Sequence, residues 1–210
     1  MIIAHASDLH ADFEVLAQLD VKPDLFVFTG DMLPNATRGH VHTELNYQGH
    51  WYKRNAWSLL SKLHNAPVLL VPGNHDYIDL AAYLRRDGVD AQDVTPQGVV
   101  FQGKRFSGFG HIPVIAGEWN REVSQNELAG LTQATMQSDP DVILTHAPPD
   151  GILNGQYTGN IALVRALLSP EHRVNLHLFG HSHEDGGRHL ALGGILFVNS
   201  ATTVQVIELL

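Results

Sequence analysis

The chain has 210 residues, 44% of them hydrophobic, with 13 Lys or Arg, 22 Asp or Glu and no Cys, which gives a formal net charge of −9. The absence of Cys excludes disulfide scaffolds, thiolate metal sites and Cys nucleophiles, and the acidic balance argues against long nucleic acids and anionic membranes as partners. No apolar run approaches the ~20 residues of a membrane span, and the first run is too short for a signal peptide. We therefore expect a cytoplasmic protein that forms a single domain over residues 1–210.

The predicted elements alternate between strands and helices along much of the chain. Near-continuous apolar or β-branched runs, which are typical of strands buried on both faces, lie at residues 2–6, 25–29, 68–71, 142–145 and 176–179. Helical patterns lie at residues 11–19, 51–63, 80–86, 124–136 and 161–168. Ser124 and Glu127 form a capping box at the start of the fourth helix.

Three regions depart from this alternation. Paired runs at residues 99–102 and 105–109, and at residues 188–192 and 195–199, predict hairpins, and a last strand covers residues 203–208. Residues 34–49 are polar and rich in Gly, His and Asn, and they predict a long loop. Strand–helix units combined with hairpins predict a layered α/β fold with mixed sheets.

Polar side chains follow each of the five buried-type strands. They are Asp8 and His10, then Asp31, then Asn74 with His75 and Asp76, then His146, and finally His181 with His183. Because ligands bind outside the carboxyl ends of parallel strands, we expect these side chains to converge. Oxygen and nitrogen donors without sulfur suit Mn²⁺, iron or Zn²⁺, and there are too many for one ion. The set is right for two ions ~3.5–4 Å apart that share a carboxylate, as in many phosphatases and nucleases.

The order of these motifs resembles that of the calcineurin-like metallophosphoesterases, over residues 8–183. Within that superfamily, residues 143–151, 176–187 and 197–202 look most like the metallophosphoesterase-domain branch, whose members are phosphodiesterases that act on cyclic nucleotides and model diesters. The resemblance implies a four-layer α-β-β-α sandwich with two mixed β-sheets.

The resemblance also implies roles for the polar residues. One of two metal ions would be held by Asp8, His10, Asp31 and His183, and the second by Asp31, Asn74, His146 and His181. His75 would lie over the substrate phosphate, and Asp76 would orient the His75 imidazole.

These roles lead to the hypothesis of a dinuclear-metal phosphoesterase. The two ions would supply a hydroxide that attacks phosphorus, and His75 would protonate the leaving oxygen. The expected substrate is a small phosphodiester, with cyclic nucleotides among the candidates. A phosphomonoesterase or nucleotidase with the same metal core, and a non-catalytic scaffold of the same fold, are the alternatives.

A rival motif and a group of histidines remain. His181, His183 and Asp185 match the His-x-His-x-Asp motif of metallo-β-lactamase-type hydrolases. That motif lies early in those chains, and this interpretation would leave the clusters at residues 8–10, 30–31 and 73–76 unexplained. His40, His42 and His50 fall in or next to the polar loop, near residues 47, 51 and 52 (aromatic) and 38 and 54 (Arg). This region is either a solvated loop or a wall of the substrate site. We expect His5 to be a hydrogen-bonded core residue and His177 to be surface or structural.

Overall fold

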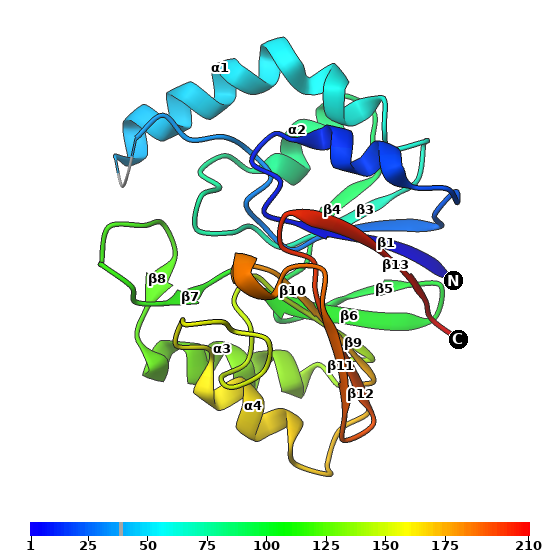
Figure 1. The fold of residues 1–210 in the computed structure, drawn as a ribbon, viewed down its shortest axis with the longest axis vertical. Helices are drawn as coiled ribbons and strands as arrows, with labels where there is room; N and C mark the ends of the chain where they lie inside the picture. Colours follow the sequence, from blue (N-terminus) through cyan, green and yellow to red (C-terminus); the bar gives the residue numbers. More distant parts are fainter. Residues whose placement is uncertain (38–39) are drawn as a thin grey trace.

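The computed structural model describes residues 1–37 and 40–210, and two mixed β-sheets form its centre (Figure 1). The first sheet has the order β13-β1-β2-β3-β4. Its strands are β1 (Ile2–Ser7), β2 (Leu25–Phe28), β3 (Val68–Leu70), β4 (Ala91–Asp93) and β13 (Thr203–Glu208). Strands β1 to β4 run parallel, and β13 is antiparallel to β1.

The second sheet has the order β11-β12-β10-β9-β6-β5. Its strands are β5 (Val99–Phe101), β6 (Lys104–Phe109), β9 (Val142–Thr145), β10 (Leu176–Phe179), β11 (His189–Leu192) and β12 (Ile195–Asn199). The inner four strands are parallel, and the two predicted hairpins add β5 and β11 as antiparallel edges. A short parallel pair, β7 (Ile112–Pro113) and β8 (Glu122–Val123), lies apart from both sheets.

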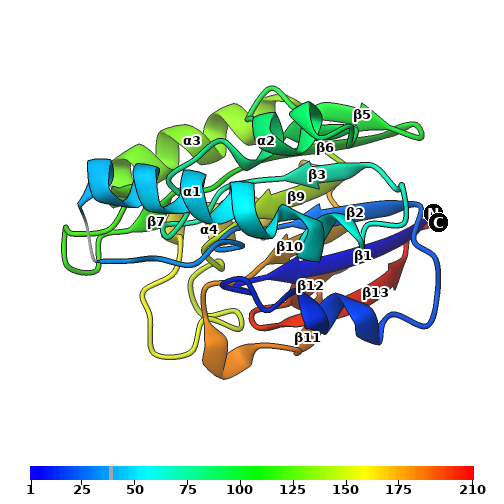
Figure 2. The same ribbon diagram turned by 90° about the horizontal axis from the view of Figure 1, so that it is seen from above.

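Helices cover the outer face of each sheet (Figures 1 and 2). The first sheet is covered by α1 (Val41–Leu60), α2 (Leu80–Arg86) and the 3₁₀ helix η1 (Phe13–Gln18). The second is covered by α3 (Gln125–Gln137) and α4 (Ile161–Leu167), and a one-turn 3₁₀ helix, η2 (His183–Asp185), follows β10. The four-layer α-β-β-α sandwich with two mixed sheets is confirmed.

Three buried clusters fill the spaces between the four layers. Successive strand residues point to opposite faces, so each central strand supplies two of these clusters. Phe26 and Phe28 of β2 pack under the helices, whereas Leu25 and Val27 pack between the sheets. This burial on both faces explains the continuous apolar runs of the sequence. Because the central strands run parallel, their carboxyl ends lie along one edge of each sheet.

The predicted loop over residues 34–49 is wrong in its second half. Helix α1 begins at Val41, and the predicted helix over residues 51–63 is only its later part. The buried positions of the first turns of α1 are Glu44, Gln48 and Gly49, so this half has no apolar periodicity to reveal it.

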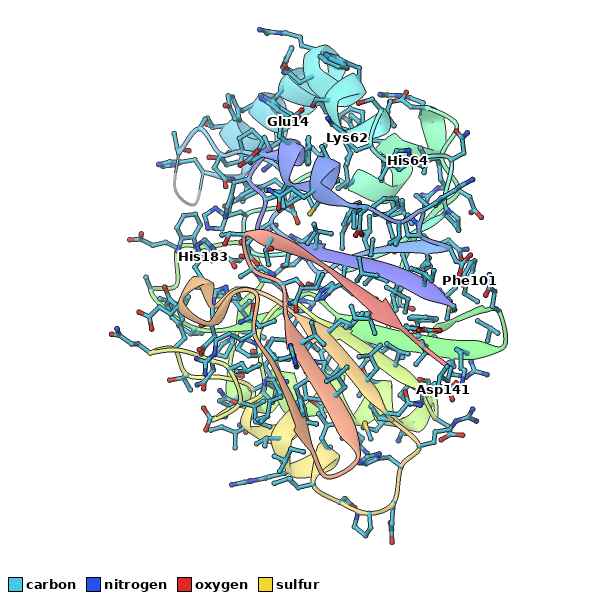
Figure 3. All side chains as sticks on the ribbon, turned by 45° about the vertical axis from the view of Figure 1, so that its right-hand side comes forward. Glu14, Lys62, His64, Phe101, Asp141 and His183 are labelled. Atoms are coloured by element: carbon cyan, nitrogen blue, oxygen red, sulfur yellow. The ribbon has the colours of Figure 1, made fainter. Side chains whose placement is uncertain are left out.

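The remaining local predictions meet a mixed outcome. The capping box of Ser124 and Glu127 is confirmed, whereas residues 11–19 contain a 3₁₀ helix and not an α-helix. Lys62, just after α1, pairs with Glu14 of η1 at 3.0 Å on the outer surface (Figure 3). None of the helices in the described ranges combines the length and apolarity that a bilayer span requires.

Two histidines lie inside the sandwich. His5 on β1 is confirmed as a hydrogen-bonded core residue, with its Nε2 2.9 Å from the Thr29 hydroxyl and its Nδ1 2.7 Å from the Ser200 hydroxyl. His177 on β10 is fully buried, and its Nε2 lies 2.8 Å from the Thr145 hydroxyl. Burial lowers the pKa of each histidine from 6.5 to about 3, so both are neutral in the folded protein.

Candidate metal centre

A cleft of about 410 Å³ lies at the carboxyl ends of the central strands. The sequence-predicted site residues that line it are Asp8, His10, Asp31, Asn74, His75, His181 and His183. His146, at the end of β9, is fully buried next to Asp31. Asp76 lines a separate cavity with Asp93 and Arg121. The structure thus brings eight of the nine predicted residues, all but Asp76, to one place.

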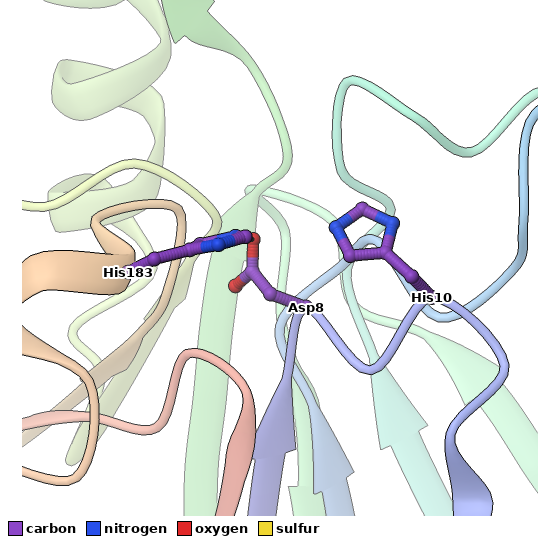
Figure 4. Close-up of side chains that lie close together, drawn as sticks. All are labelled: Asp8, His10 and His183. Atoms are coloured by element: carbon purple, nitrogen blue, oxygen red, sulfur yellow. Dashed lines mark hydrogen bonds and ion pairs between the residues drawn. The ribbon is translucent and has the colours of Figure 1, made fainter.

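The first group of possible ligands is Asp8, His10 and His183, whose ligand atoms all lie within 4.8 Å of one another. The His183 ring reaches Asp8 from η2, with Nε2 3.2 Å from Oδ1, and His10 stands on the turn after β1 (Figure 4). The backbone N–H of His181 donates to the other Asp8 oxygen at 2.8 Å. That bond fixes the carboxylate so that Oδ1 faces the histidines.

The second group is Asp31, Asn74 and His146. His146 Nε2 lies 3.2 Å from Asp31 Oδ2 and 2.9 Å from Asn74 Oδ1. The other ring nitrogen, Nδ1, donates to the Thr29 carbonyl at 2.7 Å, which orients the ring. Ligand atoms ~2.1 Å from a common ion stand about 3.0–3.4 Å apart, so this spacing suits a shared cation. Asp8, Asp31 and His146 also lie within 4.8 Å, which makes the two groups neighbours.

Four residues of the centre have a left-handed backbone conformation. Asp8, His10, Asp31 and His181 have positive φ, at 55°, 45°, 55° and 65°, a conformation that residues far from the cleft, such as His64 and Gln102, also adopt. Each such non-glycine conformation costs about 1–3 kcal/mol and persists only where the surroundings enforce it. The neighbouring Gly73 cannot be replaced, because a Cβ there would lie 2.1 Å from Asp31 Oδ1.

The electrostatics couple the buried acids to the histidines. Burial alone would raise the pKa of Asp31, but the charge of His146 outweighs it and holds that pKa far below its usual range. Burial likewise opposes the charge on His146, yet the Asp31 and Asp8 carboxylates raise its pKa to about 9. Burial lowers the pKa of His181 to about 4, which leaves a neutral imidazole. Two buried carboxylates thus require positive charge beside them.

The donor chemistry therefore fits metal ions. Carboxylate, amide and imidazole donors without sulfur match the Mn²⁺, iron and Zn²⁺ class, and the two adjacent groups match a pair of ions. The positive charge that His146 supplies in the protein alone is the charge that cations would supply when bound.

His75 lies beside this centre with its two ring nitrogens in different surroundings. Nε2 faces Asp31, 4.0 Å from Oδ2, and Nδ1 lies 2.5 Å from Asn35 Oδ1. The Asn35 amide nitrogen donates to Glu44 at 3.2 Å and to the His75 carbonyl at 3.0 Å. The amide orientation is thereby set, so Nδ1 of His75 carries the proton and Nε2 faces the cleft. Asn35 lies four positions after Asp31 and was not predicted.

The side chain that accepts a hydrogen bond from the His75 imidazole is therefore Asn35 and not the expected Asp76. The Asp76 carboxylate accepts hydrogen bonds from the backbone N–H groups of Asp31 at 2.7 Å, Met32 at 3.2 Å and Gly73 at 2.9 Å. Asp76 thus joins the loops that follow β2 and β3, and it fixes the main chain that carries Asp31.

Helix α1 holds these loops from the other side. Glu44 accepts hydrogen bonds from the segment around Asn35, including the N–H of Ala36 at 3.0 Å and that of Thr37 at 2.5 Å. Gln48 donates to the His75 carbonyl at 2.6 Å and accepts from the N–H of Tyr77 at 2.8 Å. The polar buried face of α1 thus supports the loops that carry Asn35 and His75.

Residues 34–54 had two alternatives, a solvated loop or a wall of the substrate site, and the described residues do not support the wall. His40, His42 and His50 are exposed, and none of them lines the cleft. Tyr52, which lies on α1, is buried, and residue 38 lies outside the described ranges. The apolar wall of the cleft comes instead from Ile115, Ala116, Trp119 and Tyr157, which carry no local motif that could have revealed them.

The chain matches a known protein family and resembles a solved structure in its fold. A family model described as calcineurin-like phosphoesterase matches residues 1–185. No curated protein matches the chain. Among solved structures, the chain is similar to the sulfate thiohydrolase SoxB of Thermus thermophilus in complex with glycerol, with 13% identity and a TM-score of 0.44 over 84% of this chain and 33% of that one. The chain thus spans about a third of the length of that protein.

Proposed function

The chain belongs to the calcineurin-like phosphoesterase family, and from this premise we propose that it is a metal-dependent phosphodiesterase that acts on small diesters, cyclic nucleotides among them. Asp8, His10, Asp31 and His183 would hold one ion, and Asp31 would share the second with a further set of ligands. These are Asn74, His146 and His181. When bound, the two ions would lower the pKa of water and neutralise charge on the phosphoryl oxygens.

His75 acts as the general acid in this proposal. Its Nε2 faces the cleft beside Asp31, and its Nδ1–H is held by Asn35, so a proton on Nε2 can pass to the leaving oxygen. Asn35 is a neutral acceptor and adds no charge of its own, so it orients the imidazole without holding the proton on the ring as strongly as a carboxylate would. Ready release of the proton is what a general acid requires.

The charge of the cleft is the observation that favours diesters over monoesters. Apart from the ligand residues and His75, its described lining contains one charged side chain, the carboxylate of Glu184, and neither Lys nor Arg. A monoester brings up to two negative charges to this lining and a diester only one. The diester therefore meets less repulsion from Glu184 and needs less compensation from cationic side chains.

A rate panel with Mn²⁺-supplemented protein tests the proposal. We expect kcat/KM for bis-p-nitrophenyl phosphate to exceed that for p-nitrophenyl phosphate by about tenfold or more, which corresponds to about 1.4 kcal/mol. Cyclic 2′,3′- and 3′,5′-nucleotides in the same panel identify the natural class. A preference for the monoester would support the phosphatase alternative, and no hydrolysis of any ester would support a scaffold.

A further inference from the structure

One wall of the cleft takes no part in the chemistry described above. Ile115, Ala116 and Trp119 belong to the loop between β7 and β8, and Tyr157 belongs to the loop between β9 and α4. These four residues form what we name the apolar wall. Ile115 and Tyr157 are 47% and 43% exposed. Exposed apolar side chains that gather beside an active site, and are not scattered singly over the surface, indicate a binding surface.

The aromatic rings of this wall touch residues of the metal centre. The Trp119 indole packs against the His75 imidazole, with ring centroids 4.1 Å apart and planes inclined by 40°. The Tyr157 ring packs against His181 at 5.2 Å. His75 delivers a proton to the leaving oxygen, so a group attached to that oxygen emerges next to Trp119.

The loop that carries Trp119 is fixed in place. The Glu122 carboxylate accepts hydrogen bonds from the N–H groups of Ile115 at 3.0 Å and Ala116 at 3.1 Å. Asn120 donates to the Asp76 carbonyl at 2.8 Å, and Arg121 donates to the Gly73 carbonyl at 3.2 Å. The loop is thus anchored to the same segment that carries His75. A wall that is held in advance binds a ligand at a lower cost in conformational entropy.

From these contacts we propose that the apolar wall is the subsite for the organic group of the substrate, and that Trp119 determines specificity. The substrate class is a phosphoester with a planar aromatic or apolar group next to a single phosphoryl group. This inference rests on the proposed phosphoesterase function and narrows its substrate. Planar groups gain contact with the indole and phenol rings, whereas small alkyl esters leave these rings exposed.

Binding of two phosphonates to the Mn²⁺-loaded protein, measured by calorimetry, tests the subsite without turnover. Phenylphosphonate and methylphosphonate carry the same anionic group, but only phenylphosphonate has an aromatic ring. We expect phenylphosphonate to bind about tenfold more tightly, which is about 1.4 kcal/mol. Trp119→Ala should reduce this ratio to about threefold or less, and Trp119→Phe should keep most of it. The matched control is Trp57→Ala, since Trp57 on α1 is 70% exposed and does not line the cleft.

The outcomes separate the subsite from the function. If Trp119 only supports His75, Trp119→Ala changes the affinity for both phosphonates equally, and the inference is overturned. A wild-type ratio near one overturns the inference as well, while hydrolysis of diesters by the same protein leaves the proposed function intact. If neither phosphonate binds and no ester is hydrolysed, the function fails and the inference fails with it. Ile115→Ala provides a second variant, with a smaller expected loss of the ratio.

Discussion

Replacement of Glu44 by Gln tests how α1 supports the loop that carries Asn35. Glu44 is fully buried on α1 and accepts hydrogen bonds from Asn35, Ala36 and Thr37. Burial alone would raise the pKa of Glu44, but the N–H groups of Thr37 and Ala36 outweigh it and lower that pKa, so the carboxylate is charged in the folded protein. Glu44→Gln keeps the shape of the side chain and removes the charge.

The expected loss follows from the donors around Glu44. If the amide oxygen of Gln faces Ala36 and Asn35, the Thr37 hydroxyl can turn and accept from the amide nitrogen. The Thr37 N–H then meets an N–H group and loses its acceptor. A hydrogen bond to a charged group contributes about 1.5–3 kcal/mol, so we expect Glu44→Gln to lower the free energy of unfolding by about 2–3 kcal/mol. For a chain of this size, that corresponds to a decrease in Tm of about 5–10 °C.

Thermal unfolding of the metal-free protein measures this effect. The matched control is Glu14→Gln, because Glu14 lies on the surface in an ion pair with Lys62 and its side chain is 77% exposed. Such pairs contribute about 0–1 kcal/mol. Equal stability of the two variants would refute the view that Glu44 supports the loops.

Three further predictions address the acid, the metal site and the core. His75→Ala should reduce turnover of alkyl esters by about 10²–10⁴-fold and that of p-nitrophenyl esters much less, and equal losses would contradict the role of His75 as general acid. Asn74→Ala should leave less than the wild-type Mn²⁺ content after dialysis, measured by elemental analysis; unchanged content would exclude Asn74 as a ligand. His177 has a pKa near 3 when folded and 6.5 when unfolded, so the unfolded chain binds the extra proton and stability falls as the pH decreases below 6.5. Between about pH 7 and pH 5, the free energy of unfolding, measured with urea, should therefore decrease by about 2 kcal/mol less for His177→Phe than for the wild type. Equal decreases in the two proteins would mean that His177 is not kept neutral.

The fold and the polar residues that gather at the cleft could be predicted because their signals are local. A buried parallel strand appears in the sequence as a continuous apolar run, and the polar residue at its carboxyl end follows within the next few positions. Asp8 and His146 are far apart in the chain, yet each could be placed by the strand before it. The order of the motifs then supplied the family, which the match over residues 1–185 confirms.

The support of the site could not be predicted because its contacts are distant in sequence. Asn35 and His75 are 40 positions apart, and Asn35 lies in a segment whose composition indicates only a loop. The start of α1 could not be predicted, because its first buried residue is Glu44 and its first turns present no apolar stripe. Asp76 stands next to His75 in the sequence, but the backbone N–H groups of the neighbouring loops occupy its carboxylate.

The most direct test of the central claim is the rate of p-nitrophenol release from bis-p-nitrophenyl phosphate as metal-free protein is titrated with Mn²⁺. We expect no hydrolysis without metal and a rate that increases until about two ions are bound per chain. Asp31→Asn should abolish this increase, because Asp31 is the proposed shared ligand of the two ions and its Oδ2 lies 3.2 Å from His146 Nε2. Two results would contradict a dinuclear phosphoesterase centre at the carboxyl ends of these strands. One is a rate of hydrolysis that does not depend on metal, and the other is a wild-type protein that is saturated with Mn²⁺ but hydrolyses no ester.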